Sequence, residues 1–325
     1  MFRVEAGTGQ WHFTGMTSQK SLSPRAWAEL LLLALVWGGS FLSNRLALDS
    51  AGVLTTVAIR VTVAAALLWV YVFARRLPVP QSFRVWAAFL VMGALNNAIP
   101  FSLITWAQTS VPSGLAAILN SSTALFGIVV AALAFRDERL TGRRLGGVFL
   151  GIAGVAVVIG PQALRALDPT SLGQFALLMA SLSYASAAAF ARNALAALPP
   201  QIAAAGMLTG ASLLLLPAAL AFGQPPDLSW PASAWGALFY LAVIAGAGAY
   251  LLYFRVLATA GAGNLSLVTL LVAPFAVLLG ALVLDESLPP RDFAGFALIA
   301  LGLLVIDGRM AARFKKPRES GGAPR

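Results

Sequence analysis

The sequence predicts an all-α membrane protein with ten transmembrane helices, built as two inverted repeats of five helices each. Three observations predict this fold class: an apolar composition, ten apolar runs of membrane-spanning length, and a pattern that occurs twice. Apolar residues make up 59% of the 325 residues, charged residues only 10%, and the mean hydropathy is +0.83. A soluble domain has too little interior to bury that fraction, so we expect the chain to lie in a lipid bilayer.

Ten apolar runs follow a polar first segment, and each is near the roughly 20 residues that cross ~30 Å of hydrocarbon. The expected spans are 26–47, 53–74, 84–107, 112–135, 143–161, 172–195, 201–222, 232–257, 262–284 and 291–308. The connections are short and several contain proline, so no soluble domain fits between the spans. We expect residues 1–25 to form a disordered cytoplasmic tail and residues 309–325 a basic cytoplasmic tail.

The stretch 136–160 returns later in the chain as 285–306. Asp137 and Glu138 correspond to Asp285 and Glu286, an offset of 148 residues. The match continues through Leu140 and Leu288, Arg143 and Arg291, Gly147 and Gly295, Leu150 and Leu298, and Gly154 and Gly302. A weaker echo relates the residues around Trp37 to those around Tyr184. Such a long shared spacing indicates duplication, and it predicts one repeat over 26–161 and a second over 172–308.

Charge placement predicts the orientation of the chain in the membrane. With the N-terminus inside, most Lys and Arg fall on the cytoplasmic side, including 75–76, 143–144 and the C-terminal tail, as the positive-inside rule requires. Five spans per repeat is an odd number, so the two copies cross in opposite directions. Inverted repeats are typical of secondary transporters, whose substrate site lies near the midplane between the repeats.

Four short motifs resemble those of a known family. Residues 37–41 read Trp-Gly-Gly-Ser-Phe, residues 58–60 read Ala-Ile-Arg, and the turns 137–140 and 285–288 read Asp-Glu-Arg-Leu and Asp-Glu-Ser-Leu. Over about residues 26–308 the chain resembles the drug/metabolite transporter superfamily in its EamA-type ten-helix branch. Within that branch it is most similar to bacterial amino-acid exporters, including exporters of aromatic amino acids.

This resemblance implies a multi-pass protein of the bacterial inner membrane, with both termini cytoplasmic, that exports small metabolites by alternating access. The sequence departs from the family pattern at two places. Residues 122–126 lack a proline that the family usually has, and Ala273-Pro274 stands where many members have Glu-Pro. The missing glutamate puts carboxylate-based coupling in doubt.

Polar side chains at membrane depth are the first candidates for substrate binding, because they are costly to bury without partners. Asn96 and Asn97 lie mid-span beside Pro100, which removes a backbone donor and frees a carbonyl one turn back. Two amides beside a kinked turn could bind the amino or carboxylate group of a zwitterion. Hydrogen bonding to a neighbouring helix is the equally weighted alternative.

The fourth and ninth spans supply further polar candidates. Asn120 begins the run 120–123, whose hydroxyl residues more often bond to their own helix, so Asn120 is the favoured member. Thr269 lies before Pro274, and this mid-helix proline is expected to kink the ninth span as Pro100 kinks the third.

Aromatic residues at mid-depth form a second candidate set. Trp37 lies near the middle of its span, away from the interfacial belts where Trp usually sits, and Tyr184 is its repeat counterpart. A symmetric aromatic pair suits a midplane pocket for a largely apolar amino acid. Tyr240, Tyr250 and Tyr253 are expected nearer the ends of their span, as belt residues.

The charged side chains indicate less clearly which energy source drives transport. Glu29 and Asp307 lie at span ends, and no carboxylate lies mid-helix, so passive exchange is expected rather than obligatory proton antiport. Arg60 lies about two turns inside its span. We favour an interpretation in which it extends outward to water, and attraction of an anionic group is the alternative.

Other classes of protein are disfavoured by what the sequence lacks. Without Cys, and with His12 as the only histidine, the chain offers no thiolate, no histidine triad and no buried metal site, so we expect neither an enzyme nor a cofactor. The basic residues are scattered rather than gathered on one face, which argues against nucleic-acid binding. A small-molecule substrate, the bilayer and a monomeric state are expected, with oligomers left open. The alternatives are a multidrug exporter of the same superfamily and a non-transporting receptor or assembly protein.

Overall fold

The computed structural model describes residues 24–134, 169–195, 198–260 and 290–307 continuously. Between these ranges it describes only positions 142, 145–147, 149–151, 153–154, 157, 268, 272, 275–276, 279–280 and 282–283. Every regular element in these ranges is a helix. The all-α class predicted from the composition is therefore confirmed for this part of the chain.

Six helical stretches within the described residues are long and apolar enough to cross a membrane. They are Trp27–Leu48, Val53–Ala74, Phe83–Ala107, Leu172–Ala191, Pro200–Phe222 and Ala232–Tyr253. These stretches correspond to the first three expected spans and to the sixth, seventh and eighth. The tenth is represented by α14 (Pro290–Asp307), while the fifth and ninth lie mostly outside the described residues.

Several helices begin at a proline. Pro24 begins α1 (Pro24–Leu48), Pro169 begins α8 (Pro169–Ala194) and Pro200 begins α9 (Pro200–Phe222), as Pro290 begins α14. The first turn of a helix has no partner for its backbone N–H groups, so a residue without that donor costs nothing there. The same residue type that separates the apolar runs in the sequence thus marks where the helices begin.

The third and eighth spans each change from α-helix to π-helix part-way along. In the third, α3 (Phe83–Gly93) passes into η1 (Ala94–Ala98) and then α4 (Ile99–Ala107). In the eighth, α10 (Ala232–Phe239) passes into η2 (Tyr240–Gly248) and then α11 (Ala249–Ala260). Pro100 is the second residue of α4, so the proline expected to kink this span directly follows the π-turn. π-turns inside α-helices are rare and often occur at functional sites.

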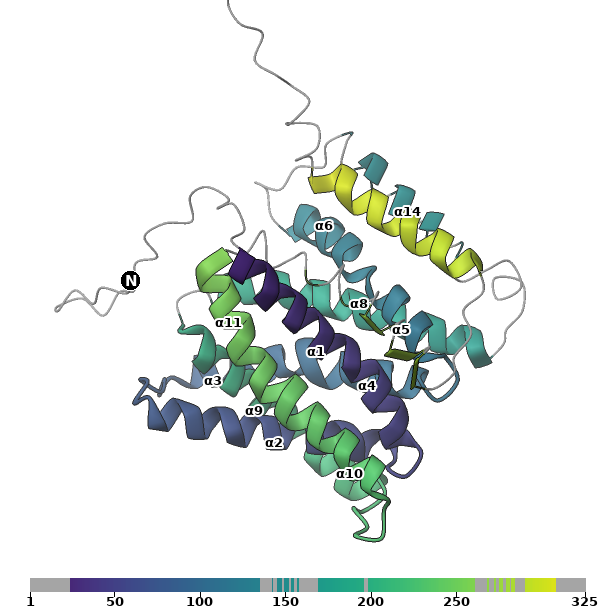
Figure 1. Cartoon of the computed structure of the whole chain (residues 1–325). Coiled ribbons are helices and arrows are strands. Elements are labelled where there is room, and N and C mark those ends of the chain that lie inside the picture. Colours follow the sequence, from purple (N-terminus) through teal and green to yellow (C-terminus); the bar gives the residue numbers. More distant parts are fainter. Residues whose placement is uncertain are drawn as a thin grey trace, which may run out of the picture.

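The helices pair across the two repeats. The α1 helix lies along α10, η2 and α11, and α8 lies along α3, η1 and α4 in the same antiparallel sense. The α1–α11 pair crosses the front of the molecule in Figure 1. The counterpart helices α2 (Val53–Ala74) and α9 pack directly on each other. In each case a helix of one repeat packs against helices of the other repeat, as expected for two inverted five-helix units.

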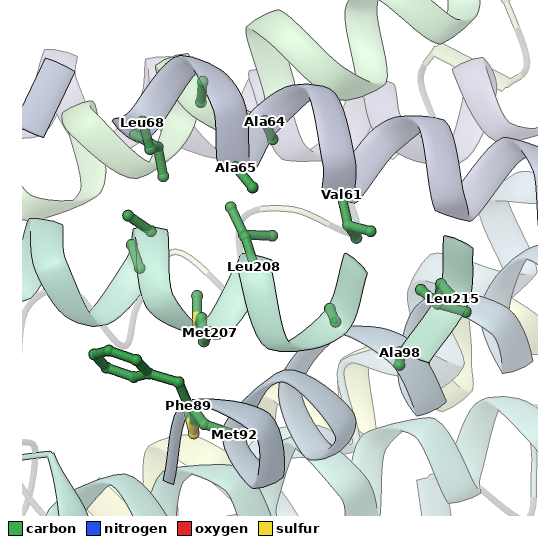
Figure 2. Packing of buried hydrophobic residues seen from close by; sticks show 14 of the residues in the cluster. Val61, Ala64, Ala65, Leu68, Phe89, Met92, Ala98, Met207, Leu208 and Leu215 are labelled. Carbon is green, nitrogen blue, oxygen red and sulfur yellow. The ribbon is translucent and has the colours of Figure 1, made fainter. Parts of the chain in front are cut away.

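An extensive apolar contact joins α2, α9 and α3. Figure 2 shows Leu208 of α9 pointing toward Ala65 and Val61 of α2, while Met207 points toward Phe89 of α3. All of these side chains are buried.

Three glycines let α3 and α9 approach closely. A Cβ at Gly93 would lie 2.7 Å from the backbone carbon of Gly210, and one at Gly210 would lie 2.8 Å from the Cα of Leu90. On α9, Gly206 and Gly210 are four residues apart, the small-residue spacing by which membrane helices pack. The close crossing fixes α3 immediately before the π-turn η1.

The fourth span is broken at its middle, where the sequence predicted one continuous helix over 112–135. It consists of α5 (Ser113–Asn120) and α6 (Thr123–Ala134), separated by a turn at residues 121–122. At this turn Thr123 Oγ1 donates a hydrogen bond of 2.7 Å to the Asn120 carbonyl. Ser121 Oγ donates one of 3.1 Å to the Ala117 carbonyl, which also accepts the backbone N–H of Ser121. A break at membrane depth is tolerated only where such partners satisfy the backbone.

Candidate functional site

Four polar or charged side chains from both repeats meet between the helices: Arg60, Asn97, Tyr184 and Tyr250. We call them the central cluster. They come from α2, η1, α8 and α11 respectively. Asn97 Nδ2 donates a hydrogen bond of 3.4 Å to the Tyr250 hydroxyl. The Arg60 guanidinium lies on the ring of Phe101, one turn after Asn97, and both tyrosines pack against the buried apolar cluster that contains Phe101.

Arg60 is buried, with only 8% of its surface exposed. Its guanidinium carbon lies 3.9 Å from the ring centroid of Phe101, a cation–π contact with α4. The expectation that this side chain extends outward to water is therefore wrong. The α4 helix brings the aromatic face of Phe101 to the guanidinium, and no local feature of the sequence around residue 60 shows that contact.

The π-turn η1 presents the two asparagines in different ways. Asn97 is fully buried and its Oδ1 has no hydrogen-bond partner, whereas Asn96 is only partly buried and its Nδ2 lies 3.6 Å from the Met207 sulfur. Ser183 of α8 donates a hydrogen bond of 2.7 Å to the Leu95 carbonyl. The π-turn is thus held by the first helix of the other repeat.

The second π-turn makes the corresponding contact with α1. The Tyr240 hydroxyl, at the start of η2, donates a hydrogen bond of 2.9 Å to the Val36 carbonyl. Val36 and Ser183 are related by the repeat spacing, as are Trp37 and Tyr184. Gly39 makes this approach possible, because a Cβ there would collide with the Tyr240 hydroxyl.

Trp37 lies against an aromatic partner from the other repeat. Its ring centroid is 5.8 Å from that of Tyr253 on α11, a tilted arrangement typical of favourable aromatic pairs. Tyr253 and Tyr250 lie one turn apart on α11, so Trp37 is connected to the central cluster through Tyr253. The expectation that Tyr240, Tyr250 and Tyr253 are belt residues is wrong, since all three face partners within the bundle.

Asn120 lies at the break in the fourth span. Its backbone carbonyl also accepts a hydrogen bond of 3.3 Å from Ser181, which is one turn before Tyr184 on α8. Its side-chain Oδ1 is buried and has no partner. Thr269 and Pro274 lie outside the described residues.

The structure therefore groups Asn97 and Tyr184 in the central cluster and connects Trp37 to that cluster through Tyr253. Asn120 contacts Ser181, which lies one turn before Tyr184 on α8. Two members of the central cluster, Arg60 and Tyr250, were not predicted as site residues. A signal for Arg60 did exist in the sequence, because a cation two turns inside a span with no acid nearby has no obvious partner.

A hollow of about 380 Å³ lies elsewhere, at the end of α1 opposite Glu29. Its lining includes Arg45, Asp49 and Gln108. Here Gln108 Nε2 donates to the Phe41 carbonyl over 2.7 Å and Oε1 accepts from Asn44 over 3.0 Å, so the polar groups of Gln108 are already paired. The unpaired groups at Arg60 and Asn97 make the central cluster the better candidate site. Among the residues that the structure describes, no group of three or more His, Asp or Glu side chains could hold a metal ion.

Comparison with known proteins gives the family. The family model described as the EamA-like transporter family matches residues 26–160 and again residues 171–307. The chain belongs to the EamA-like transporter family. It is therefore a transporter homologue of the drug/metabolite type, as the paired acidic turns and the Trp-Gly-Gly motif predicted.

Relatives of this EamA-like protein match over most of their length. It is 26% identical to a "probable terminal-alkyne amino-acid exporter" of Streptantibioticus cattleyicolor, over 92% of this chain and 99% of the relative. It is also 26% identical to a "probable amino-acid metabolite efflux pump" of Escherichia coli, over 85% and 92%. An uncharacterized transporter of Bacillus subtilis is 20% identical over 85% of this chain and 94% of its own.

A crystal structure superposes on the EamA-like chain with a TM-score of 0.64 and 20% sequence identity. The match covers 90% of this chain and 99% of the other. This likeness shows a shared fold.

Proposed function

We propose that this protein exports amino acids with aromatic or other largely apolar side chains across the inner membrane, by alternating access around a central site. The observation that carries the proposal is the meeting of polar and aromatic side chains from both repeats. Asn97 and Trp37 of the first repeat contact Tyr250 and Tyr253 of the second. Secondary transporters built from inverted repeats bind their substrates at such an interface.

The chemistry of the proposed site suits an amphipathic substrate. The rings of Trp37, Tyr184 and Tyr253 offer apolar walls, and all three are partly exposed although they pack against the core. The amides of Asn97 and Asn120 each have a buried, unpaired carbonyl oxygen. A few polar groups within aromatic walls are typical of sites for small, mostly apolar ligands. Two relatives named as an amino-acid exporter and an amino-acid metabolite efflux pump support this substrate class.

Alternating access requires that the two ends of the bundle open in turn. At the end of the bundle where α1 begins, Glu29 bridges the repeats, with its Oε1 2.9 Å from Arg255 Nη2 and 3.2 Å from Arg25 Nε. In the proposed orientation this end faces the cytoplasm, and both termini lie there. Breaking the contact between α1 and α11 would open a path from the cytoplasm toward Trp37.

The test is counterflow of a panel of amino acids in proteoliposomes that contain the purified protein. Wild type is expected to exchange aromatic and large apolar amino acids. Alanine variants of Trp37, Asn97, Asn120 and Tyr184 are expected to weaken apparent affinity, several-fold for one lost hydrogen bond worth about 0.5–1.5 kcal/mol.

Trp106→Ala is the matched control, because Trp106 is 44% exposed on α4 and makes none of the contacts of the site. Its counterflow should equal that of wild type. Unchanged counterflow in all four site variants, with normal folding, would place the site elsewhere. A complete lack of amino-acid exchange by wild type would contradict the proposed substrate class.

A further inference from the structure

Arg60 carries a charge that no acidic side chain among the described residues neutralises. An arginine side chain cannot lose its proton in a protein, so burial does not remove the charge. Within the part of the chain that the structure describes, no carboxylate lies within ion-pair distance of the guanidinium, and its Nε is buried without a hydrogen-bond partner. The contact with the Phe101 ring orients the cation but supplies no negative charge.

A buried, unpaired charge is among the costliest features that a folded protein can hold. It persists where a partner arrives during function, and at membrane depth such residues mark substrate or ion pathways. A planar guanidinium is suited to a carboxylate, which it can bind through two parallel hydrogen bonds. The Phe101 ring covers one face of the guanidinium, so its in-plane edges are the places where an anion can bind.

The neighbour of Arg60 completes a site for a zwitterion. Asn97 is fully buried, and its Oδ1 is a hydrogen-bond acceptor with no donor. Its Nδ2 donates to the Tyr250 hydroxyl, and Asn97 lies one turn before Phe101, whose ring contacts the guanidinium. An ammonium group is a donor only, so it would satisfy the unpaired oxygen.

We propose that Arg60 binds the carboxylate of the transported molecule, while Asn97 Oδ1 accepts a hydrogen bond from its ammonium group. This inference rests on the proposed function, because it takes the central cluster as the substrate site. It adds that a carboxylate is a required feature of the substrate. The positive charge of Arg60 would repel cationic drugs without an acid group, so these are not expected as substrates.

Binding of matched analogues to purified protein tests this assignment apart from transport. Thermal shift and tryptophan fluorescence would be measured with phenylalanine, phenylalaninamide, phenethylamine and 3-phenylpropanoate, and with chloride and inorganic phosphate as anion controls. Wild type should bind the two carboxylates roughly 10- to 100-fold more tightly than the amide or the amine, which is the factor expected for one charge-assisted pair.

The decisive variant is Arg60→Met, which keeps the apolar stem of the side chain and removes its charged guanidinium. It should bind the acid and the amide with equal affinity, and Arg60→Lys should retain a reduced preference for the acid. Asn97→Leu should reduce the difference in affinity between phenylalanine and 3-phenylpropanoate. Arg45→Met is the matched control, because Arg45 lies at the far end of α1, where it donates to the Gln108 carbonyl. This variant should prefer the acid over the amide as strongly as wild type does.

The outcomes separate the two proposals. If Arg60→Met still prefers the acid over the amide, or wild type never does, Arg60 is not the carboxylate anchor even where amino acids are exchanged. If Arg60→Met does not fold, the wild-type analogue series and Arg60→Lys decide. If 3-phenylpropanoate binding depends on Arg60 but no amino acid is exchanged, the carboxylate-binding role of Arg60 is kept and the proposed substrate class is contradicted. If chloride and phosphate bind much more weakly than the organic acids, the assignment is supported. If these inorganic anions bind as tightly as the organic acids, the assignment is overturned.

Discussion

Gly210→Ala should destabilise the protein by forcing α3 and α9 apart. The added Cβ would lie 2.8 Å from the Cα of Leu90, while carbon atoms in contact are normally about 3.5–4.0 Å apart, so the helices must separate by roughly 1 Å. Overpacking of this kind costs about 1–3 kcal/mol, and replacing a helical glycine with alanine returns about 0.5–1 kcal/mol. We therefore expect a net loss of about 1 kcal/mol, and at most ~2.5 kcal/mol, seen as a lower apparent Tm of the purified protein in detergent.

Gly236→Ala is the matched control. Gly236 is also helical, in α10, but a Cβ there would meet nothing within 4 Å, so only the helix-propensity gain remains and the apparent Tm should stay level or rise. Counterflow gives a second measurement, because α3 leads directly into η1 and its Asn97. A Gly210→Ala protein as stable as Gly236→Ala would refute the close crossing of α3 and α9.

Three further predictions follow from the charges of the chain. Reporter fusions after Leu22 and after Lys316 should both give cytoplasmic signals, and signals on opposite sides would mean that the spans are miscounted. Substrate should equilibrate across proteoliposomes without an imposed pH gradient, because no described carboxylate lies at mid-depth; accumulation that depends strictly on the gradient would contradict this. Glu29→Gln should loosen α1 from α11 and raise maleimide labelling of Ala34→Cys, in a chain that otherwise lacks cysteine, by up to about fivefold for a part-exposed ion pair worth ~1 kcal/mol or less. An unchanged labelling rate would show that this ion pair does not hold the two helices together.

The features predicted well from the sequence are those that depend on local composition. A run of about 20 apolar residues is enough to indicate a spanning helix, because the bilayer demands internal hydrogen bonding whatever the neighbours are. The positions of the six spanning helices therefore agree with the expected ones within a few residues. The same reasoning singled out Asn97 and Trp37, since polar and indole groups at mid-depth need partners.

The features that were missed depend on contacts between distant segments. Arg60 has the same local sequence whether it extends to water or lies on Phe101, and only the packing of α2 against α4 decides between them. Tyr250 lies toward the end of its expected span, and the contact with Asn97 is what places it in the cluster. The break after Asn120 similarly depends on Ser181 from another helix, which shares the task of satisfying the freed carbonyl.

The paired π-turns bear on which changes the chain can tolerate. In a regular α-helix one extra residue turns everything beyond it by about 100°, whereas a wide π-turn absorbs that residue locally. Shifted by the repeat spacing, Ala94–Ala98 falls inside Tyr240–Gly248, so both repeats carry the wide turn at corresponding places. A one-residue deletion in η2 would therefore close the wide turn to an α-helical one and leave Tyr250 and Tyr253 facing Asn97 and Trp37. These two segments can thus lose one residue with less effect on the central cluster than the regular helices around them.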